Sequence, residues 1–152
     1  MKTKEQLIQL LKSNIEEFNE YKKLNYNDTE NVEYYRFDLS GANLSGYDLA
    51  GVDFFRTDLS GANLYKCNLS GAFLRAAYCD GANLGSANCY IADMSYSILT
   101  NTNLRGINLL GAQLYNTNMD KANFCEWDLK GAKMEKDKKR KIIRKLKNEK
   151  TK

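Results

Sequence analysis

The sequence predicts an all-β solenoid, a narrow coil of chain that turns a corner every five residues. From Phe37 to Met134 a leucine-like residue recurs at every fifth position without one insertion or deletion. Two residues before it stands a residue that is usually small, and nine of the ten glycines stand two residues after it. A period of five matches neither an α-helix, with about 3.6 residues per turn, nor a strand, which alternates every two residues. The apolar residues can share one side only if the chain turns in every unit.

Each unit, such as Ala42-Asn43-Leu44-Ser45-Gly46, has five positions with separate tasks. Positions 1 and 3 can point inward while position 2 points outward, as in a short strand. Positions 4 and 5 turn the chain, and glycine at position 5 easily adopts the positive φ that a type II turn requires. Four sides then close a square of about twenty residues on which the next square stacks, which predicts about five coils.

This pattern resembles the pentapeptide-repeat family, whose motif reads A(D/N)LXX. The units that begin at Ala42, Ala62, Ala82 and Ala122 stand close to that motif. The resemblance implies a right-handed quadrilateral β-helix and a bacterial protein. It implies no single function, because different sites are carried by one fold.

Both ends of the chain are predicted to be helical, which divides it into three regions. Residues 1–31 form an amphipathic capping helix and a polar link (Asn25 to Asn31), residues 32–136 the β-helix, and residues 137–152 a short basic helix or tail. Thr3 and Gln6 match a capping box, and the helix stripe should close the bottom of the prism. That stripe consists of Leu7, Leu10, Leu11, Ile15, Phe18, Tyr21 and Leu24. Wide residues at position 1 are expected in the end coils: Phe37, Tyr47 and Val52 below, and Trp127 above.

The composition argues against an enzyme and against a bound cofactor or metal. The chain has no histidine, so a Ser-His or Cys-His pair and histidine ligation of a metal are impossible. Of the four cysteines, Cys67, Cys79 and Cys89 are expected to point inward as structural thiols, and Cys125 outward. No apolar stretch approaches the length of a membrane span and the charged start does not resemble a signal peptide, so we expect a reducing cytoplasm.

Two outer faces follow the motif and two depart from it. One regular face carries Asn43, Asn63, Asn83, Asn103 and Asn123, and its neighbour carries Asp48, Asn68, Asn88, Asn108 and Asp128 with a small apolar cluster of Tyr90, Ile91 and Leu110. Stacked amides can bond along a column, so we interpret the face of five asparagines as structural. The other faces share a corner with six large residues, which are Phe55, Phe73, Tyr78, Tyr96, Ile98 and Tyr115. Such a patch is typical of an interaction surface, although the N-terminal segment could also cover it.

The net positive charge of the protein comes from its C-terminal region. Residues 137–152 carry nine basic and two acidic side chains, a net charge of +7, whereas residues 37–136 carry a net charge of −2. The candidate polyanion-binding residues are Lys138, Lys139, Arg140, Lys141, Arg144, Lys145 and Lys147. A solvated capping helix and a contact with an acidic surface both fit this pattern.

These observations favour a non-enzymatic scaffold that binds a protein partner or its own copy through the aromatic corner. The alternative is association with nucleic acid through the basic tail. The family resemblance also suggests inhibition or protection of DNA gyrase by a duplex-DNA mimic. Such a mimic needs a dense negative charge, about two charges per 3.4 Å of duplex, and the repeat lacks it.

Overall fold

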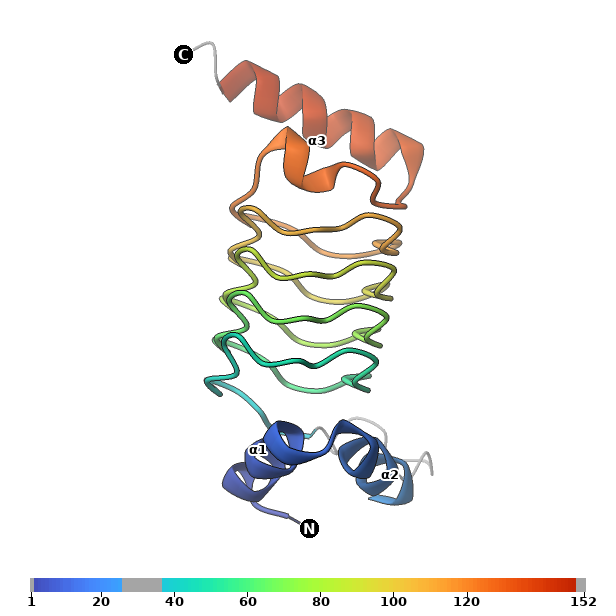
Figure 1. Ribbon diagram of the computed structural model, residues 1–152. Helices are drawn as coiled ribbons and strands as arrows, with labels where there is room; N and C mark the ends of the chain where they lie inside the picture. The colour runs from blue at the N-terminus through green and yellow to red at the C-terminus, as the bar shows by residue number, and fades with distance from the viewer. Residues whose placement is uncertain (1, 26–36, 150–152) are drawn as a thin grey trace.

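The computed structural model describes residues 2–25 and 37–149 and shows a rod of stacked coils with helices at both ends. Helices α1 (Lys4–Ser13) and α2 (Ile15–Asn25) lie below the coils. A short 3₁₀ helix, η1 (Glu126–Leu129), interrupts the last coil, and α3 (Lys136–Glu149) lies across the top (Figure 1). The predicted polar link and the predicted boundary at 31/32 lie outside the described residues, apart from Asn25 at the end of α2.

The coils are joined by parallel bridges between residues twenty positions apart, which confirms the predicted solenoid. The bridges begin at Asp38↔Asp58, end at Gln113↔Lys133, and fall on every fifth residue except Asn108, whose expected partner Asp128 lies in η1, so a coil has four sides. Each bridge residue stands at position 2 and is flanked by turns. One paired residue per side is too short for a strand, so the described coils form isolated bridges in place of extended strands.

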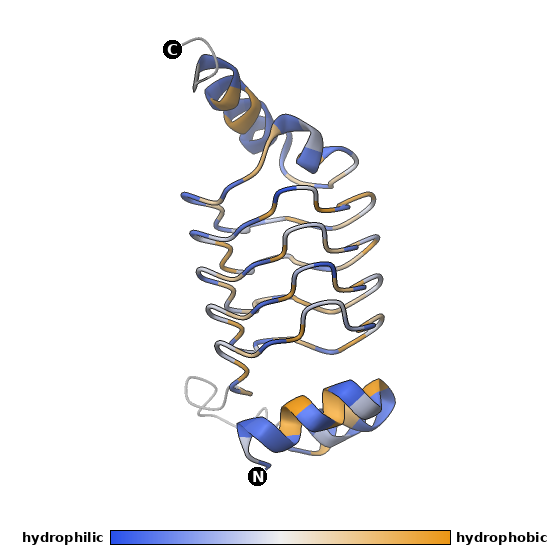
Figure 2. Cartoon of the chain, turned by 60° about the vertical axis from the view of Figure 1, so that its left-hand side comes forward, coloured by the Kyte–Doolittle hydropathy of each residue, from blue (hydrophilic) through white to orange (hydrophobic). Residues whose placement is uncertain are grey.

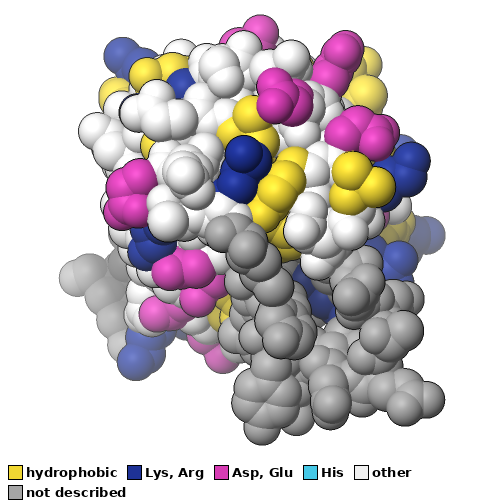
Figure 3. Space-filling model, turned by 90° about the horizontal axis from the view of Figure 1, so that it is seen from below, with side chains coloured by type: hydrophobic (Ala, Val, Ile, Leu, Met, Phe, Trp, Pro, Cys, Tyr) yellow, Lys and Arg dark blue, Asp and Glu magenta, His cyan; other side chains and the backbone are white. Residues whose placement is uncertain are grey.

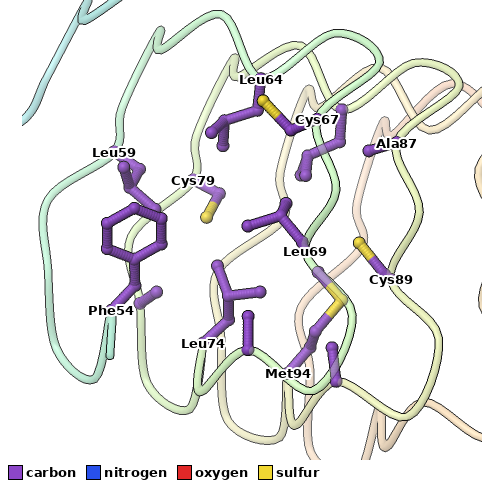
Figure 4. Packing of buried hydrophobic residues seen from close by; sticks show 14 of the residues in the cluster. Phe54, Leu59, Leu64, Cys67, Leu69, Leu74, Cys79, Ala87, Cys89 and Met94 are labelled. Atoms are coloured by element: carbon purple, nitrogen blue, oxygen red, sulfur yellow. The ribbon is translucent and has the colours of Figure 1, made fainter. Parts of the chain in front are cut away.

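The interior of the rod is filled by the residues at positions 1 and 3, as the period predicts. Position 3 supplies leucine columns such as Leu64 and Leu84, and position 1 supplies small residues such as Ala82, all of them buried. The thiols of Cys67, Cys79 and Cys89 point into this core among the leucines, as expected (Figure 4). A narrow square leaves room for one large and one small side chain per side, so the motif alternates them.

Every corner except those at Glu126 and Lys136, which lie in helices, contains a residue with positive φ, but glycine is required less often than the sequence suggested. Nine glycines and nine other residues adopt this conformation at position 5, and they include Ile91 (φ 52°) and Tyr96 (φ 61°). A β-branched or bulky residue adopts it at a cost of about 1–2 kcal/mol. The turn bond, for example from Ala77 N to Leu74 O at 3.0 Å, and the bonds to both neighbouring coils hold these corners in place.

The outward Asp and Asn side chains at position 2 stabilise the turns that follow them. Asp58 Oδ1 accepts the backbone N–H of Ser60 at 2.9 Å, and Asn103 Oδ1 accepts that of Arg105 at 3.2 Å. The asparagines also bond along their columns, as predicted; Asn103 Nδ2 donates to Asn83 Oδ1 at 2.9 Å. Gly85 lies beside this pair, where an added Cβ would come within 2.9 Å of Asn103 Nδ2, so the column itself explains this glycine.

The N-terminal cap consists of two helices where the sequence predicted one. The capping box of Thr3 and Gln6 is confirmed, but the backbone becomes extended at Asn14, whose side chain then accepts the N–H of Glu17 at 3.1 Å and starts α2. The break turns α2 across the first coil, where Phe18 packs edge-on against Phe37 and Phe54. Leu24, a predicted stripe residue, is 78% exposed because it lies on the other side of α2. Seen from below, this end shows acidic and basic side chains together (Figure 3).

Trp127, expected to mark the top coil, lies in the last coil but does not enter its core. The chain forms η1 at this point, and Trp127 is 75% exposed. Asp128, expected on the outer column above Asn108, is buried instead and accepts the backbone N–H groups of Gly106 and Cys125 at 3.0 and 2.7 Å. One carboxylate therefore satisfies two donors where the regular ladder stops, and the 3₁₀ turn brings it there.

Candidate interaction surfaces

The six corner residues predicted from the sequence lie along one edge of the rod, which we call the aromatic edge. Phe73, Tyr96 and Tyr115 are 55%, 53% and 39% exposed, whereas Phe55, Tyr78 and Ile98 are half-buried. The guanidinium of Arg75 lies over the Tyr96 ring at 5.2 Å from its centroid. This combination of aromatic residues and arginine is typical of the centres of protein interfaces.

A shallow groove of about 510 Å³ lies between α2 and the lower part of this edge. Asn19, Glu20 and Lys23 line it from α2, and Asp53, Phe55, Phe73, Arg75 and Asp93 line it from the coils. The groove carries charges of both signs beside apolar rings. The N-terminal helices therefore border the aromatic edge at its base.

Three side chains of the N-terminal helices bond to the open lower side of the first coil. Lys4 Nζ donates to Ser40 O at 2.9 Å, and Lys22 Nζ donates to the carbonyls of Asp53 and Phe55 at 3.0 and 2.6 Å. Asn19 accepts the N–H of Asp53 at 2.8 Å and donates to Gly51 O at 3.1 Å. Apart from Gly51 O, these are the backbone groups that a lower coil would have paired, so the side chains replace the missing ladder.

Lys22 is a buried lysine that sequence reasoning missed. Its side chain is about 2% exposed and forms an ion pair with Asp53 at 3.0 Å. Burial lowers the pKa of Lys22 from 10.5 to about 8, although the neighbouring Asp53 carboxylate opposes this effect. Its position four residues after Phe18, within the apolar stripe, was the signal that could have identified it.

The seven candidate polyanion-binding residues lie on α3 and differ in their surroundings. Lys138 and Lys139 donate to the carbonyls of Thr117 and Ala132 in the last coil, so they hold α3 against the rod. Lys147 lies 3.9 Å from Glu126. Arg140, Lys141, Arg144 and Lys145 are exposed. Figure 2 shows α3 as largely hydrophilic with a smaller apolar part. Ile142 of α3 is half-buried and packs against the core.

The thiols of the core and the carboxylates at position 2 are either buried or hydrogen-bonded to neighbouring turns. Burial raises the pKa of the Cys79 thiol to about 12 and raises that of the Cys67 and Cys89 thiols as well, which keeps all three protonated and unreactive. The described residues contain no cluster of three or more metal-binding side chains. Carboxylates such as Asp38 and Asp58 accept hydrogen bonds from the turns that follow them.

Comparison with known proteins identifies the family. A family model described as "Pentapeptide repeats" matches residues 38–71, 72–109 and 107–136 of this chain. The chain belongs to the pentapeptide-repeat family. Comparison with curated proteins gives no match.

Several solved structures of pentapeptide-repeat proteins are similar to this one. A protein from Nostoc Pcc 7120 is 34% identical over 66% of this chain and 86% of its own, with a TM-score of 0.51. Rfr23 from the cyanobacterium Cyanothece 51142 is 35% identical over 66% of this chain, with a TM-score of 0.45, and the match spans 61% of its own length. A protein of the Arabidopsis thaliana thylakoid lumen is 28% identical over 70% and 77% of the two chains, with a TM-score of 0.43.

The helices of this pentapeptide-repeat protein are short and polar. Among the described residues, none is long and apolar enough to cross a membrane.

The shifted pKa of Lys22 predicts a specific pH dependence of stability. Between pH 8 and 10.5 the unfolded state keeps the Lys22 proton while the folded state releases it, so the folded state gains stability as the pH rises. We expect the free energy of unfolding of the wild type, relative to Lys22→Met, to increase by up to about 3 kcal/mol over this range, at about 1.4 kcal/mol per pKa unit. Urea unfolding of both proteins at several pH values measures this difference in free energy, from which the contribution of the buried thiols cancels. A difference that stays constant between pH 8 and 10.5 would contradict a lowered pKa of Lys22.

Proposed function

We propose that this pentapeptide-repeat protein is a non-enzymatic scaffold that binds protein through its aromatic edge. The observation that carries this proposal is the replacement of Asp or Asn at position 2 by Phe73, Tyr78 and Ile98. At most other position 2 sites, Asp or Asn accepts the N–H of the following turn, a bond worth about 1 kcal/mol that an apolar side chain cannot accept. Phe73 is also largely exposed. Three such replacements on one edge reduce local stability and add apolar surface, which fits selection for binding.

A second copy of this chain is the partner that the edge fits best. A two-fold symmetric contact places the same patch on both sides, so the patch must complement itself. The groove beside Phe73 satisfies this requirement because Arg75 and Lys23 lie there with Asp93 and Glu20. Each cation can therefore meet an anion of the other copy while the rings pack together.

The chemistry of the chain supports the non-enzymatic part of the proposal. Turn-bonded carboxylates and buried thiols with raised pKa values offer neither a nucleophile nor a general acid. The free cysteines, three of them buried, also support the expectation of a reducing compartment such as the cytoplasm.

Removal of the exposed rings of the aromatic edge should strongly weaken self-association. We expect the variant Phe73→Ser/Tyr96→Ser/Tyr115→Ser to weaken the dimer at least about 100-fold, since interface aromatic residues contribute about 1–2 kcal/mol each. Sedimentation equilibrium of the full-length protein over a range of concentrations measures this change.

The matched control removes the same number of exposed apolar residues from the neighbouring corner. Tyr90→Ser/Ile91→Ser/Leu110→Ser should leave the dimer unchanged. A wild type that stays monomeric at all concentrations would contradict self-association through this edge. Equal weakening by both triple variants would show that exposed apolar area in general causes association.

A second candidate function is the binding of nucleic acid by the outer side of α3. The observation that favours it is a helix with eight basic and two acidic residues, on which Arg140 and Arg144 are exposed one turn apart. Phosphates of a duplex can contact both guanidinium groups, and such binding is independent of base sequence. The net charge of −2 on residues 37–136 argues against DNA mimicry.

This second candidate predicts salt-dependent binding that α3 controls. We expect Arg140→Gln/Arg144→Gln to reduce the slope of log K against log salt concentration by about 2, since each lost phosphate contact removes about 0.9. Fluorescence anisotropy with a labelled random-sequence duplex measures it. Arg105→Gln/Lys66→Gln, on the side of the rod, is the control and should leave the slope unchanged. Identical slopes for the wild type and both variants would show that this side of α3 does not contact the phosphates.

A further inference from the structure

A groove of about 450 Å³ lies between α3 and the last coil. Its floor is apolar and comes from both elements: Met119, Ala122 and Phe124 from the coil, and Ile142 and Leu146 from α3. Lys121, Lys138, Lys141 and Lys145 line it as well, with Asp120 as the acidic member. The volume lies within the usual range of ligand sites, about 300–1,000 Å³.

The position 3 residues of the two end coils are covered to different degrees. Below, α1 and α2 lie against the first coil, whose position 3 residues Leu39, Leu44, Leu49 and Phe54 are completely buried, although Phe37 and Tyr47 at position 1 keep part of their surface exposed. Above, the single helix α3 crosses the last coil obliquely (Figure 1), and Ala122 and Phe124 stay half-buried at positions that are fully buried in the middle of the rod. The groove is therefore a part of the core that α3 leaves uncovered.

We propose that this groove binds an acidic amphipathic helix of a partner protein, which lies beside α3 and completes the upper cap. Lys138, Lys141 and Lys145 stand at i, i+3 and i+7 of α3, so they share one side of the helix over about 10.5 Å. Two turns of a partner helix have the same length. Such a helix can place two or three apolar residues on the floor and its carboxylates against these lysines.

Charge decides between this partner and a second copy of the chain. A second α3 in the groove would bring eight basic residues of one copy against eight of the other, and like charges at close range are unfavourable. Lys138 keeps its bond to Thr117 O, which places its ammonium group at the coil side of the groove. An acidic helix neutralises this rim, whereas nucleic acid would neutralise it but leave the apolar floor uncovered.

A designed peptide tests the proposal on the full-length protein. The probe is a fourteen-residue amidated helix with leucines at i, i+4 and i+7 and glutamates on both flanks. Its control is a peptide of equal composition whose scrambled order removes the amphipathic pattern. We expect the probe to bind in isothermal titration calorimetry with a Kd on the order of 10 μM, and the scrambled peptide at least tenfold more weakly.

Three variants identify the binding surface. Lys141→Glu should lower the affinity for the probe at least tenfold because it replaces a positive charge at the rim of the groove with a negative one. Phe124→Ala should lower the affinity because it removes apolar surface from the floor. Arg144→Glu, the same charge reversal outside the groove, should change binding less than threefold. Circular dichroism checks that each variant is folded, and Lys141→Glu keeps the test valid if Phe124→Ala unfolds.

Each other outcome overturns the proposal. Equal binding of the scrambled peptide, or equal weakening by Lys141→Glu and Arg144→Glu, would reduce the contact to general attraction by a basic helix. Vesicles of phosphatidylglycerol and a random-sequence DNA duplex are tested in parallel. If the probe does not bind, but the vesicles bind and Phe124→Ala weakens their binding, the groove is a lipid site. If the duplex alone binds, α3 is a nucleic-acid contact.

Discussion

The hydrogen-bond ladder between coils is the interaction on which the rest of the structure depends, and its two ends determine the caps. Within the rod each coil pairs with the coil above and the coil below through bridges twenty residues apart. The first and last coils each have one open side, where unpaired backbone groups would lose stability and invite association with other chains. Below, Lys4, Lys22 and Asn19 supply the missing partners. Above, Lys138 and Lys139 do so, and Asp128 and Glu135 accept the N–H groups of Gly106 and Asn116 where the last coil departs from the regular ladder.

The same ladder explains where function can reside in this pentapeptide-repeat protein. Positions 1 and 3 are committed to the core, positions 4 and 5 to the turns, and most position 2 residues to the turn N–H groups. A binding surface can therefore arise where position 2 departs from Asp or Asn, as on the aromatic edge, or where a cap covers a coil incompletely, as beside α3. A rigid rod presents both surfaces with little conformational entropy to lose on binding.

The sequence predicts the periodic part of the structure well and the ends poorly, for one physical reason. A strict period identifies each inward and outward position, so the buried cysteines, the asparagine columns and the edge residues could be assigned before the structure was known. The break at Asn14 and the turn at Trp127 depend on single local contacts that no period encodes. The helical spacing places Lys22 within the apolar stripe, but its burial depends on the acceptors that Asp53 and Phe55 offer. The groove beside α3 could not be predicted either, because it results from how α3 packs on the last coil.

Amide hydrogen exchange at the first coil tests most directly whether cap side chains replace a missing coil. The N–H of Asp53 is bonded to Asn19, whereas the equivalent N–H of Asn63 is bonded to the backbone of Ala42. We expect both amides to be protected in the wild type. In Asn19→Ala the Asp53 amide should exchange at least about tenfold faster while Asn63 is unchanged, because the lost bond exposes one donor without opening the rod. An Asp53 amide that is unprotected in the wild type, or unaffected by Asn19→Ala, would contradict the account.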